Sequence, residues 1–353
     1  MTSKITLKDI ATEMNISRAT VHRALNGKEG VKDSLRIRIC ETAEKMGYKV
    51  NYAASSLKRK TMRLAVVLPH KEGRGRFYHK YFWDAVERFF SEAGNFNTLI
   101  ECHSFDEESD EQFDILSNLL EGEETVDGLL TMPAKNNERM HYMISRFHDR
   151  NTPVVLLDND LPGTNRLCCV APHDELLGRL GAEILNQITK RSGKILVAAG
   201  SLDNASHRYN LKGFKEFTEQ YAKELEVLEV HEYGNYQRMY DHAYKILNED
   251  ENIVAFYAVT ARDTLPLCNA VKDCGLAGKI SGVGSDLYPE SAEFLKENVI
   301  QALIYKNAFD KGLEGFRVLF DYVVKNIAPK EDCIIVPISV IMKSNLPFFE
   351  QYI

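Results

Sequence analysis

The chain has 353 residues, too many for one hydrophobic core, so we expect two or three domains. Hydrophobic residues make up 44% of it, which excludes a wholly disordered chain. The net charge of −7 would by itself argue against nucleic-acid binding, but the charge is uneven. Residues 1–60 carry 13 Lys and Arg against 6 Asp and Glu, whereas the remainder carries 31 against 45. A basic head on an acidic body predicts a head that binds a polyanion.

Several classes of protein are not expected from this sequence. The N-terminus has no uninterrupted apolar stretch, which predicts a cytoplasmic protein without membrane contact. The seven cysteines are scattered in no zinc spacing, so we expect reduced core thiols and no metal. The glycines at 73 and 75 lack the spacing of a nucleotide loop, and no catalytic motif is present. We therefore expect neither a cofactor nor an enzyme.

The first helix is predicted to start at Thr6, because Thr6 and Asp9 have the spacing of a capping box. Asn15 suits the left-handed backbone of a tight turn. Ser17 then provides an N-cap for a second helix over residues 18–25. Helix, short turn and capped helix together form a helix-turn-helix.

The second helix carries the residues expected to read DNA. Val21, Ala24 and Leu25 suit its buried face. The outward-facing positions are Arg18, Ala19, Thr20, His22 and Arg23. In this motif the start of the second helix enters the major groove, where Arg can grip guanine and Thr can contact a thymine methyl or a phosphate. The alternative is a solvated, charged helix face. A third helix is expected over residues 34–46, ended by Gly47.

These residues resemble the LacI/GalR (lactose/galactose repressor) family. The match includes residues 6–11, 17–26 and 47–48, and residues 51–57 before a strand. The resemblance implies a homodimer on a pseudo-palindromic operator, with a DNA-binding domain over 1–50 and a hinge segment over 51–61. It places Leu57 as a wedge in the minor groove, which fits the way apolar side chains kink a duplex. An ordinary linker leucine is the alternative. The other DNA contacts that it implies are Thr6, Ser17, Asn26, Asn51, Ala54 and Lys58.

From residue 62 onward, short apolar runs alternate with amphipathic stretches. The expected strands are 64–68, 98–102, 128–131, 154–157, 195–198, 225–230, 253–257, 280–283, 302–305 and 334–340. Alternating strands and helices predict parallel sheets with helices on both faces, in two lobes that hold a ligand at the strand ends. The predicted fold is therefore an all-α helix-turn-helix head followed by a two-lobed α/β domain.

The resemblance covers residues 62–353 as a periplasmic-binding-protein-like sensor domain. It implies one lobe formed by about 62–161 and 289–326, and a second formed by about 162–288 and 327–353. Its short motifs give the ligand-binding candidates: Asp158, Arg208, Asn210, Tyr236, Asp263, Asp286 and Lys306. Carboxylates and amides bind vicinal hydroxyls, and an aromatic ring covers the apolar face of a sugar.

Each candidate has a structural alternative. Asp158 and Asp286 could cap helices after strands, whereas Phe77 and Tyr78 are either further ligand platform or core. The expected ligand is a sugar or sugar derivative. The family's common residues are replaced by Asn210, Arg262 and Lys306, and the added cations would suit an acidic sugar or a sugar phosphate. The function predicted is a ligand-responsive, DNA-binding repressor, and the alternative is a solute-binding protein without a regulatory role.

Overall fold

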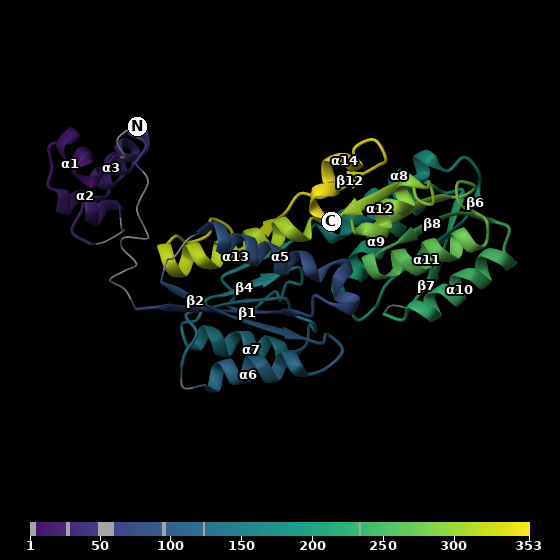
Figure 1. Ribbon diagram of the computed structural model, residues 1–353, viewed down its shortest axis with the longest axis horizontal. Coiled ribbons are helices and arrows are strands. Elements are labelled where there is room, and N and C mark those ends of the chain that lie inside the picture. The colour runs from purple at the N-terminus through teal and green to yellow at the C-terminus, as the bar shows by residue number, and fades with distance from the viewer. Residues whose placement is uncertain (1–4, 26–28, 49–59, 94–96, 123, 233) are drawn as a thin grey trace. The chain divides into compact units, whose positions relative to one another are not determined.

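The computed structural model describes residues 5–25, 29–48, 60–93, 97–122, 124–232 and 234–353. The chain divides into two compact units, Met1–Lys60 and Thr61–Ile353. The described part of the first unit is helical, and the second contains two sheets with helices (Figure 1). No helix among the described residues is both long enough and apolar enough to cross a membrane.

The head consists of helices α1 (Leu7–Glu13), α2 (Arg18–Leu25) and α3 (Asp33–Lys45). The predicted capping box is present, since the Asp9 amide donates to Thr6 Oγ1 and the Thr6 amide donates to Asp9 Oδ2. Asn15 has a φ of 52°, as a tight turn between α1 and α2 requires. The three helices bury a small core between them, formed by Ile10, Ala11, Val21, Ala24, Ile39 and Ala43.

The second unit has two six-stranded sheets. The first has the order β11-β5-β4-β3-β1-β2 and the second has the order β12-β10-β9-β8-β6-β7. The strands of the first sheet are β1 (Met62–Pro69), β2 (Thr98–Phe105), β3 (Gly128–Thr131), β4 (Val154–Leu157), β5 (Cys168–Ala171) and β11 (Cys333–Ile335). Those of the second are β6 (Gly193–Ala198), β7 (Leu225–Val230), β8 (Ile253–Ala258), β9 (Ser281–Ser285), β10 (Ala302–Tyr305) and β12 (Ser339–Ile341). All neighbouring strands are parallel except β10 and β12.

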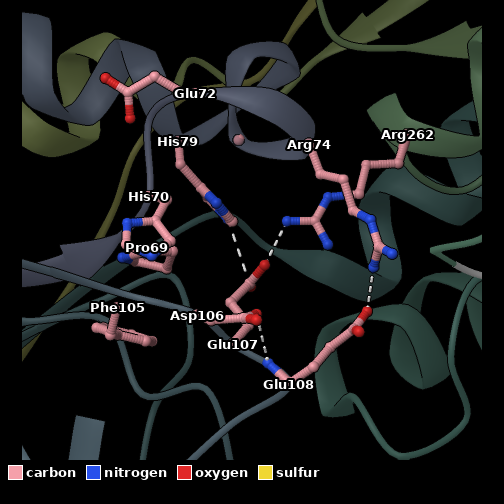
Figure 2. A pocket seen from close by; sticks show the side chains of 11 residues that line it. Pro69, His70, Glu72, Arg74, His79, Phe105, Asp106, Glu107, Glu108 and Arg262 are labelled. Carbon is pink, nitrogen blue, oxygen red and sulfur yellow. Dashed lines mark hydrogen bonds and ion pairs between the residues drawn. The ribbon is translucent and has the colours of Figure 1, made fainter. Parts of the chain in front are cut away.

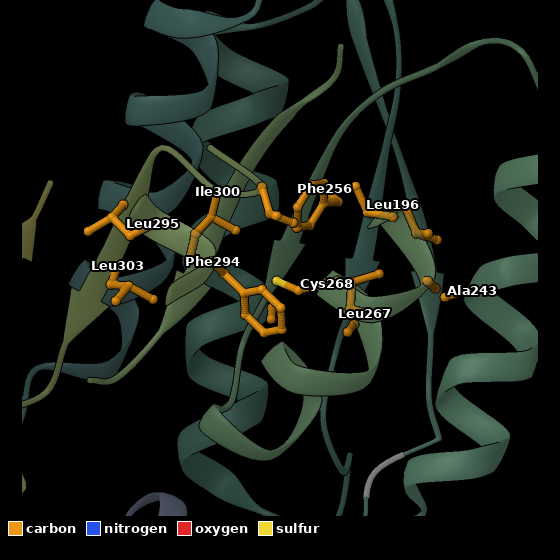
Figure 3. Packing of buried hydrophobic residues seen from close by; sticks show 14 of the residues in the cluster. Leu196, Ala243, Phe256, Leu267, Cys268, Phe294, Leu295, Ile300 and Leu303 are labelled. Atoms are coloured by element: carbon orange, nitrogen blue, oxygen red, sulfur yellow. The ribbon is translucent and has the colours of Figure 1, made fainter. Parts of the chain in front are cut away.

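Helices cover both faces of each sheet (Figure 1). On the first sheet, α5 (His79–Ala93) and α13 (Ala308–Lys325) pack on one face, and α6 (Glu111–Glu121) and α7 (Glu138–Asp149) on the other. On the second, α8 (Asp174–Ile188) and α9 (Ala205–Tyr221) oppose α10 (Tyr236–Glu249), α11 (Ala261–Asp273) and α12 (Pro289–Lys296). The short elements are η1 (Gly73–Phe77), α14 (Leu346–Phe349) and η2 (Glu350–Tyr352). Figure 3 shows the apolar contacts beneath α11 and α12, with Phe256, Cys268 and Phe294.

Two glycines set the close packing of α8 on α9. A Cβ at Gly178 would lie 1.7 Å from the Asn210 carbonyl oxygen, and one at Gly213 would lie 2.0 Å from the Glu175 carbonyl oxygen. Any side chain at either position would force the helices apart. Gly213 and Gly178 therefore serve the packing of α8 against α9.

The chain crosses between the lobes three times, and all three of the predicted lobe boundaries are wrong. Strand β5 and strand β11 belong to the first sheet, although residues 162–288 and 327–353 were assigned to the second lobe. Helix α12 and strand β10 belong with the second sheet, although residues 289–326 were assigned to the first lobe. The crossovers therefore follow β5, β10 and β11.

The expected strand 334–340 is in fact two strands in different sheets. Pro337 separates β11 from β12, and its missing N–H cannot support a continuous ladder. Strand β5 is not among the predicted strands, because its four residues are too few to show a periodic pattern. The thiol prediction also needs correction, since Cys40 and Cys102 are exposed and do not belong to the core.

Candidate functional site

The exposed face of α2 carries the residues predicted to read DNA. Arg18, Ala19, His22 and Arg23 are exposed, while Val21 and Ala24 are buried against α1 and α3. Ser17 caps the helix, because its Oγ accepts from the Thr20 amide at 3.0 Å and lies 2.8 Å from Thr20 Oγ1.

This capping uses part of the hydrogen-bonding capacity of both Ser17 and Thr20. Thr6 is likewise held by Asp9 in the capping box of α1. Five further predicted DNA contacts lie outside the described residues: Asn26, Asn51, Ala54, Leu57 and Lys58.

A cleft forms where the carboxyl ends of the two sheets face each other. Asp158 follows β4 with a φ of 63°, and Asp286 follows β9 with a φ of 60°. Each amide still donates to a neighbouring strand, that of Asp158 to Val170 and that of Asp286 to Ile304, both at 2.9 Å. A non-glycine residue rarely adopts this left-handed backbone. The strand ends thus turn one carboxylate from each lobe toward the cleft.

Asp158 is held by two groups of its own lobe. The Tyr78 hydroxyl donates to both carboxylate oxygens, at 2.9 and 2.8 Å, and the fully buried Lys311 donates to Oδ1. Burial alone would raise the pKa of Asp158, but the Lys311 charge and these hydrogen bonds outweigh it and lower the pKa below its ordinary value. Burial and the nearby Asp158 charge raise the pKa of Tyr78 well above its ordinary value. Asp158 is therefore ionised, and the tyrosine is neutral.

Asp286 forms a similar pair in the second lobe. Its Oδ1 accepts from the Lys306 amide at 3.0 Å, and the Lys306 ammonium lies 3.3 Å from Oδ2. That Oδ2 atom is buried and accepts no hydrogen bond from the described part of the chain. The Lys306 ammonium also lies 5.2 Å from the centre of the Tyr78 ring, so the two lobes meet here.

Three further contacts join the lobes across the cleft. Arg262 at the start of α11 pairs with Glu107 after β2. Arg76 in η1 makes a bidentate ion pair with Glu290 of α12. The Phe77 ring packs edge-on against Tyr288, with ring centres 5.0 Å apart. We call the Arg76–Glu290 and Phe77–Tyr288 contacts together the clasp.

The centre of the cleft leaves little room in this conformation. The cavity around Tyr78, Asp158, Asp286 and Lys306 has a volume of about 50 Å³, whereas pockets for drug-sized ligands usually measure ~300–1,000 Å³. A ligand at the centre therefore requires the lobes to separate or the ion pairs to rearrange.

Larger cavities adjoin the centre. Figure 2 shows the side chains around one of about 260 Å³, with His79 and Glu107 facing each other in its middle. A second, of about 370 Å³, is lined by Phe77, Tyr236 and Asp263. A third, of about 280 Å³, lies beside the β5 and β11 crossovers and is lined by Arg208.

The predicted ligand residues thus separate into groups. Tyr78, Asp158, Asp286 and Lys306 meet at the centre of the cleft. Phe77, Tyr236 and Asp263 line the 370 Å³ cavity, and Arg208 is exposed and donates to the Leu202 carbonyl oxygen at 2.6 Å. Asp263 also caps α11 with Thr260, whose hydroxyl donates to Asp263 Oδ2 at 2.9 Å.

The structure does not place Asn210 in the cleft. Its side chain is only 2% exposed and accepts from the Tyr257 hydroxyl at 2.9 Å, within the core between α9 and β8. Asn210 lines none of the cavities described above. Its prediction as a ligand contact is therefore corrected to a structural role, since the short Gly178 and Gly213 contacts keep this helix close to its neighbours.

Sequence reasoning missed several polar groups of the cleft. Lys311 is 0% exposed and lies on the apolar stripe of α13 with Gly315 and Phe316. A lysine at a core position of a helix could have indicated a buried ion pair. Asp174 and His207 also belong to this region. Burial raises the pKa of Asp174 to about 6 and lowers that of His207 to about 3. No spacing rule would have identified either residue.

Two family descriptions match the chain. Residues 6–51 match the bacterial regulatory proteins of the lacI family, and residues 65–326 match a periplasmic binding protein domain. The two matches cover the head and most of the two-lobed unit.

Among known sequences, the chain is similar to catabolite control protein A. It is 27% identical over 311 residues to the protein of Streptococcus mutans, which covers 85% of this chain and 83% of that protein. It is 27% identical over 276 residues to the protein of Priestia megaterium, with 77% and 79% covered. It is also 28% identical over 214 residues to the HTH-type transcriptional repressor PurR of Aliivibrio salmonicida, with 59% of each covered.

Solved structures of sugar-binding proteins share the fold of the two-lobed unit. The glucose-galactose binding protein GanP of Geobacillus stearothermophilus superposes with a TM-score of 0.69 at 21% identity, covering 82% of this chain and all of that one. A solute-binding protein of Actinobacillus succinogenes with bound D-allose superposes with a TM-score of 0.72 at 16% identity, covering 81% and 99%. At these identities the likeness concerns the fold alone.

Proposed function

The chain belongs to the lacI family of bacterial regulatory proteins, and we propose that it is a DNA-binding repressor whose operator affinity is set by a small molecule held between its lobes. The observation that carries this proposal is the combination in one chain of a basic helix-turn-helix and a cleft with one strand-end aspartate from each lobe. Catalytic activity is not part of the proposal, and action on DNA implies a cytoplasmic protein.

In this proposal α2 reads the operator. Its exposed residues Arg18, Ala19, His22 and Arg23 face the major groove, with Thr6, Ser17 and Thr20 near the phosphates. A homodimer would present two such helices to the two halves of a pseudo-palindromic operator. Between them, residues 51–58 would enter the minor groove with Leu57 as the wedge.

We propose a sugar or sugar derivative as the effector, bound by Asp158 and Asp286. The cations that suggested an acidic ligand are already neutralised, since Lys306 pairs with Asp286 and Arg262 pairs with Glu107. An added phosphate would leave an excess of negative charge in a region of low dielectric constant. The Oδ2 of Asp286, which accepts no hydrogen bond from the described residues, is instead suited to accept from a ligand hydroxyl.

A gel-shift assay on the gene's own upstream DNA tests the proposal. The full chain should bind a specific site, and residues 61–353 alone should fold but not bind it. Leu57→Ala should weaken specific binding more than non-specific binding, because only a kinked site uses the wedge. An equal loss for both kinds of DNA would contradict the assignment of Leu57.

The alternative is a solute-binding protein without a regulatory role. It predicts that ligand binding to the full chain is unaffected by DNA and that no operator exists. Specific DNA binding that requires residues 1–60 would exclude this alternative.

A further inference from the structure

Lys311 contacts residues of the cleft but does not line the cleft itself. It is fully buried and lines none of the cavities described above. Its ammonium group donates to Asp158 Oδ1 and to the Tyr78 hydroxyl. The same group lies 4.9 Å from the centre of the Tyr78 ring and 5.4 Å from that of Phe82. A buried ammonium group is costly unless it is paired, so Lys311 needs Asp158 as much as Asp158 needs Lys311.

The partners of Lys311 all belong to the first lobe. Tyr78 stands directly before α5, Asp158 follows β4, and Lys311 lies in the first turn of α13. A Cβ at Gly312 would lie 3.0 Å from the Phe82 Cα atom, so the glycine beside Lys311 lets α13 pack closely on α5. Because none of these contacts involves the second lobe, the arrangement around Asp158 need not change when the lobes separate.

The two oxygens of Asp158 are occupied to different extents. Oδ1 accepts from both Lys311 and Tyr78, whereas Oδ2 accepts from Tyr78 alone among the described residues. A carboxylate oxygen can accept two hydrogen bonds, so Oδ2 retains capacity for a ligand donor. The Lys311 charge balances that of Asp158, so a donor without charge suits this position best. A cationic group would be repelled by the nearby Lys311 ammonium, and an anionic group by the Asp158 carboxylate.

We propose that Lys311 is a positioning residue of the effector site, which holds Asp158 as an oriented carboxylate and thereby selects an uncharged hydrogen-bond donor, such as a sugar hydroxyl. Lys311 touches no ligand itself and acts through Asp158 and Tyr78. The inference rests on the proposed function, because it assumes that the effector reaches Asp158.

The pH dependence of sugar binding distinguishes this role from packing. Burial raises the pKa of Asp158, and the Lys311 charge is the largest influence that lowers it. Without Lys311, Asp158 should therefore take up a proton as the pH falls, and a neutral carboxyl group accepts hydrogen bonds less strongly than a carboxylate.

Other titratable groups near Asp158 have to be considered in this comparison. The charged or titratable side chains that interact with it, besides Lys311, are Tyr78, His79, Cys169, Asp174, His207 and Lys306. Burial raises the pKa of Asp174 to about 6, so Asp174 titrates within the useful pH range. It does so in the wild type and in a Lys311 variant alike, so the informative quantity is the ratio of their affinities at each pH.

Calorimetry with neutral sugars tests the proposal. The probes are D-glucose, D-allose and D-ribose, titrated into the full chain between pH 5 and pH 8. Lys311→Met should weaken the binding of a sugar that the wild type binds, and this loss should be at least about fivefold larger at pH 5 than at pH 8. Adding Asp158→Asn removes the titrating group, so the loss in the double variant should be the same at both pH values. A loss in Lys311→Met that does not change with pH would overturn the proposal.

Two further variants separate the charge of Lys311 from a folding defect. Lys311→Gln removes the charge but keeps a hydrogen-bond donor, so it provides the same pH comparison if Lys311→Met does not fold. Lys325→Met removes another lysine of α13, which pairs with Asp321, and serves as the control. It should leave sugar binding unchanged at every pH, and a pH-dependent loss in this control would contradict a role specific to Lys311.

The positioning role and the proposed function fail in different ways. If a sugar binds and alters the affinity for operator DNA but Lys311→Met shows no pH-dependent loss, the positioning role is wrong and the regulator stands. If the pH-dependent loss occurs but the chain binds no operator, the regulator is wrong and the positioning role stands. Binding of none of the three sugars by the wild type would overturn the uncharged ligand class and the positioning role with it.

Discussion

At the scale of single residues, the buried Asp263 should make the free energy of unfolding depend on pH. Burial raises its pKa from 3.8 to about 6, which means that the folded state disfavours the ionised form. The stability that protonated Asp263 contributes to the folded state is therefore fully present below pH 4, and it is lost as the pH rises through 6. A shift of about two pKa units corresponds to at most ~3 kcal/mol.

Asp263→Asn should remove this dependence. An amide can still accept from the Thr260 hydroxyl, so the helix cap is kept. We compare the free energy of unfolding of the variant with that of the wild type at each pH. The difference, variant minus wild type, should be about 2 kcal/mol larger at pH 7 than at pH 4. Urea denaturation at several pH values measures this. The exposed Asp149→Asn serves as control, and a gain of the same size there would remove Asp263 as the cause.

The buried pair of Lys311 and Asp158 gives a second prediction at this scale. Lys311→Met leaves the Asp158 carboxylate without its cation, which should lower the free energy of unfolding by about 3 kcal/mol or more. Adding Asp158→Asn to that variant removes the orphaned charge and should restore part of the loss. A double variant no more stable than the single one, as measured by urea denaturation, would show that Lys311 stabilises the fold by packing alone.

These residues also show what the sequence could and could not reveal about the site. Asp158 and Asp286 were placed at strand ends by the family resemblance, and the structure brings both to the centre of the cleft. The partners of the charged groups in the cleft could not be predicted, because they are far away in the sequence. Lys311 lies 153 positions from Asp158, and Arg262 lies 155 positions from Glu107. Asn210 was misjudged because helix packing, and not the ligand, fixes its surroundings.

At the scale of elements, the clasp made by η1 and α12 should favour closed lobes. Glu290→Gln replaces the ion pair with Arg76 by a weaker contact. Both side chains are more than a third exposed, so we expect at most ~1 kcal/mol, or about a fivefold shift toward open lobes. Small-angle scattering from unliganded residues 61–353 should then give a larger radius of gyration.

The intrahelical pair of Lys80 and Asp84 provides the control for this experiment. Asp84→Asn breaks an exposed ion pair within α5 and joins no lobes, so the radius of gyration should stay at the wild-type value. If Glu290→Gln also leaves the radius unchanged, the clasp does not determine closure.

Elements were predicted best where the chain pattern is local. The capping box of α1, the bounds of α2 and strands such as β3, β4 and β7 follow directly from periodicity and caps. The crossovers between the lobes could not be predicted in this way. The sheet that a strand joins depends on pairing with strands far away in the sequence, as for β5, β10 and β11. A short strand such as β5 pairs with both β4 and β11 and has little periodicity of its own.

At the scale of the whole molecule, a repressor controlled through the cleft must obey reciprocity. If the effector changes the affinity for operator DNA by some factor, the operator must change the affinity for the effector by the same factor. For couplings of ordinary size this factor is roughly 5 to 150. Calorimetric titration of the effector with and without a saturating operator duplex measures one side, and a gel shift with and without the effector measures the other.

The clasp links this prediction to the structure. We consider an effector that enters by rearranging the central ion pairs and then favours closed lobes. A clasp that already closes the lobes reduces the free energy difference between open and closed lobes that such an effector could supply. Glu290→Gln should therefore weaken effector binding to free protein and increase the coupling factor, by the same amount in both measurements. A factor that rises in the DNA measurement alone would violate reciprocity and would mean that the substitution acts on the DNA-binding head by another route. A factor that is unchanged in both would place the coupling outside lobe closure.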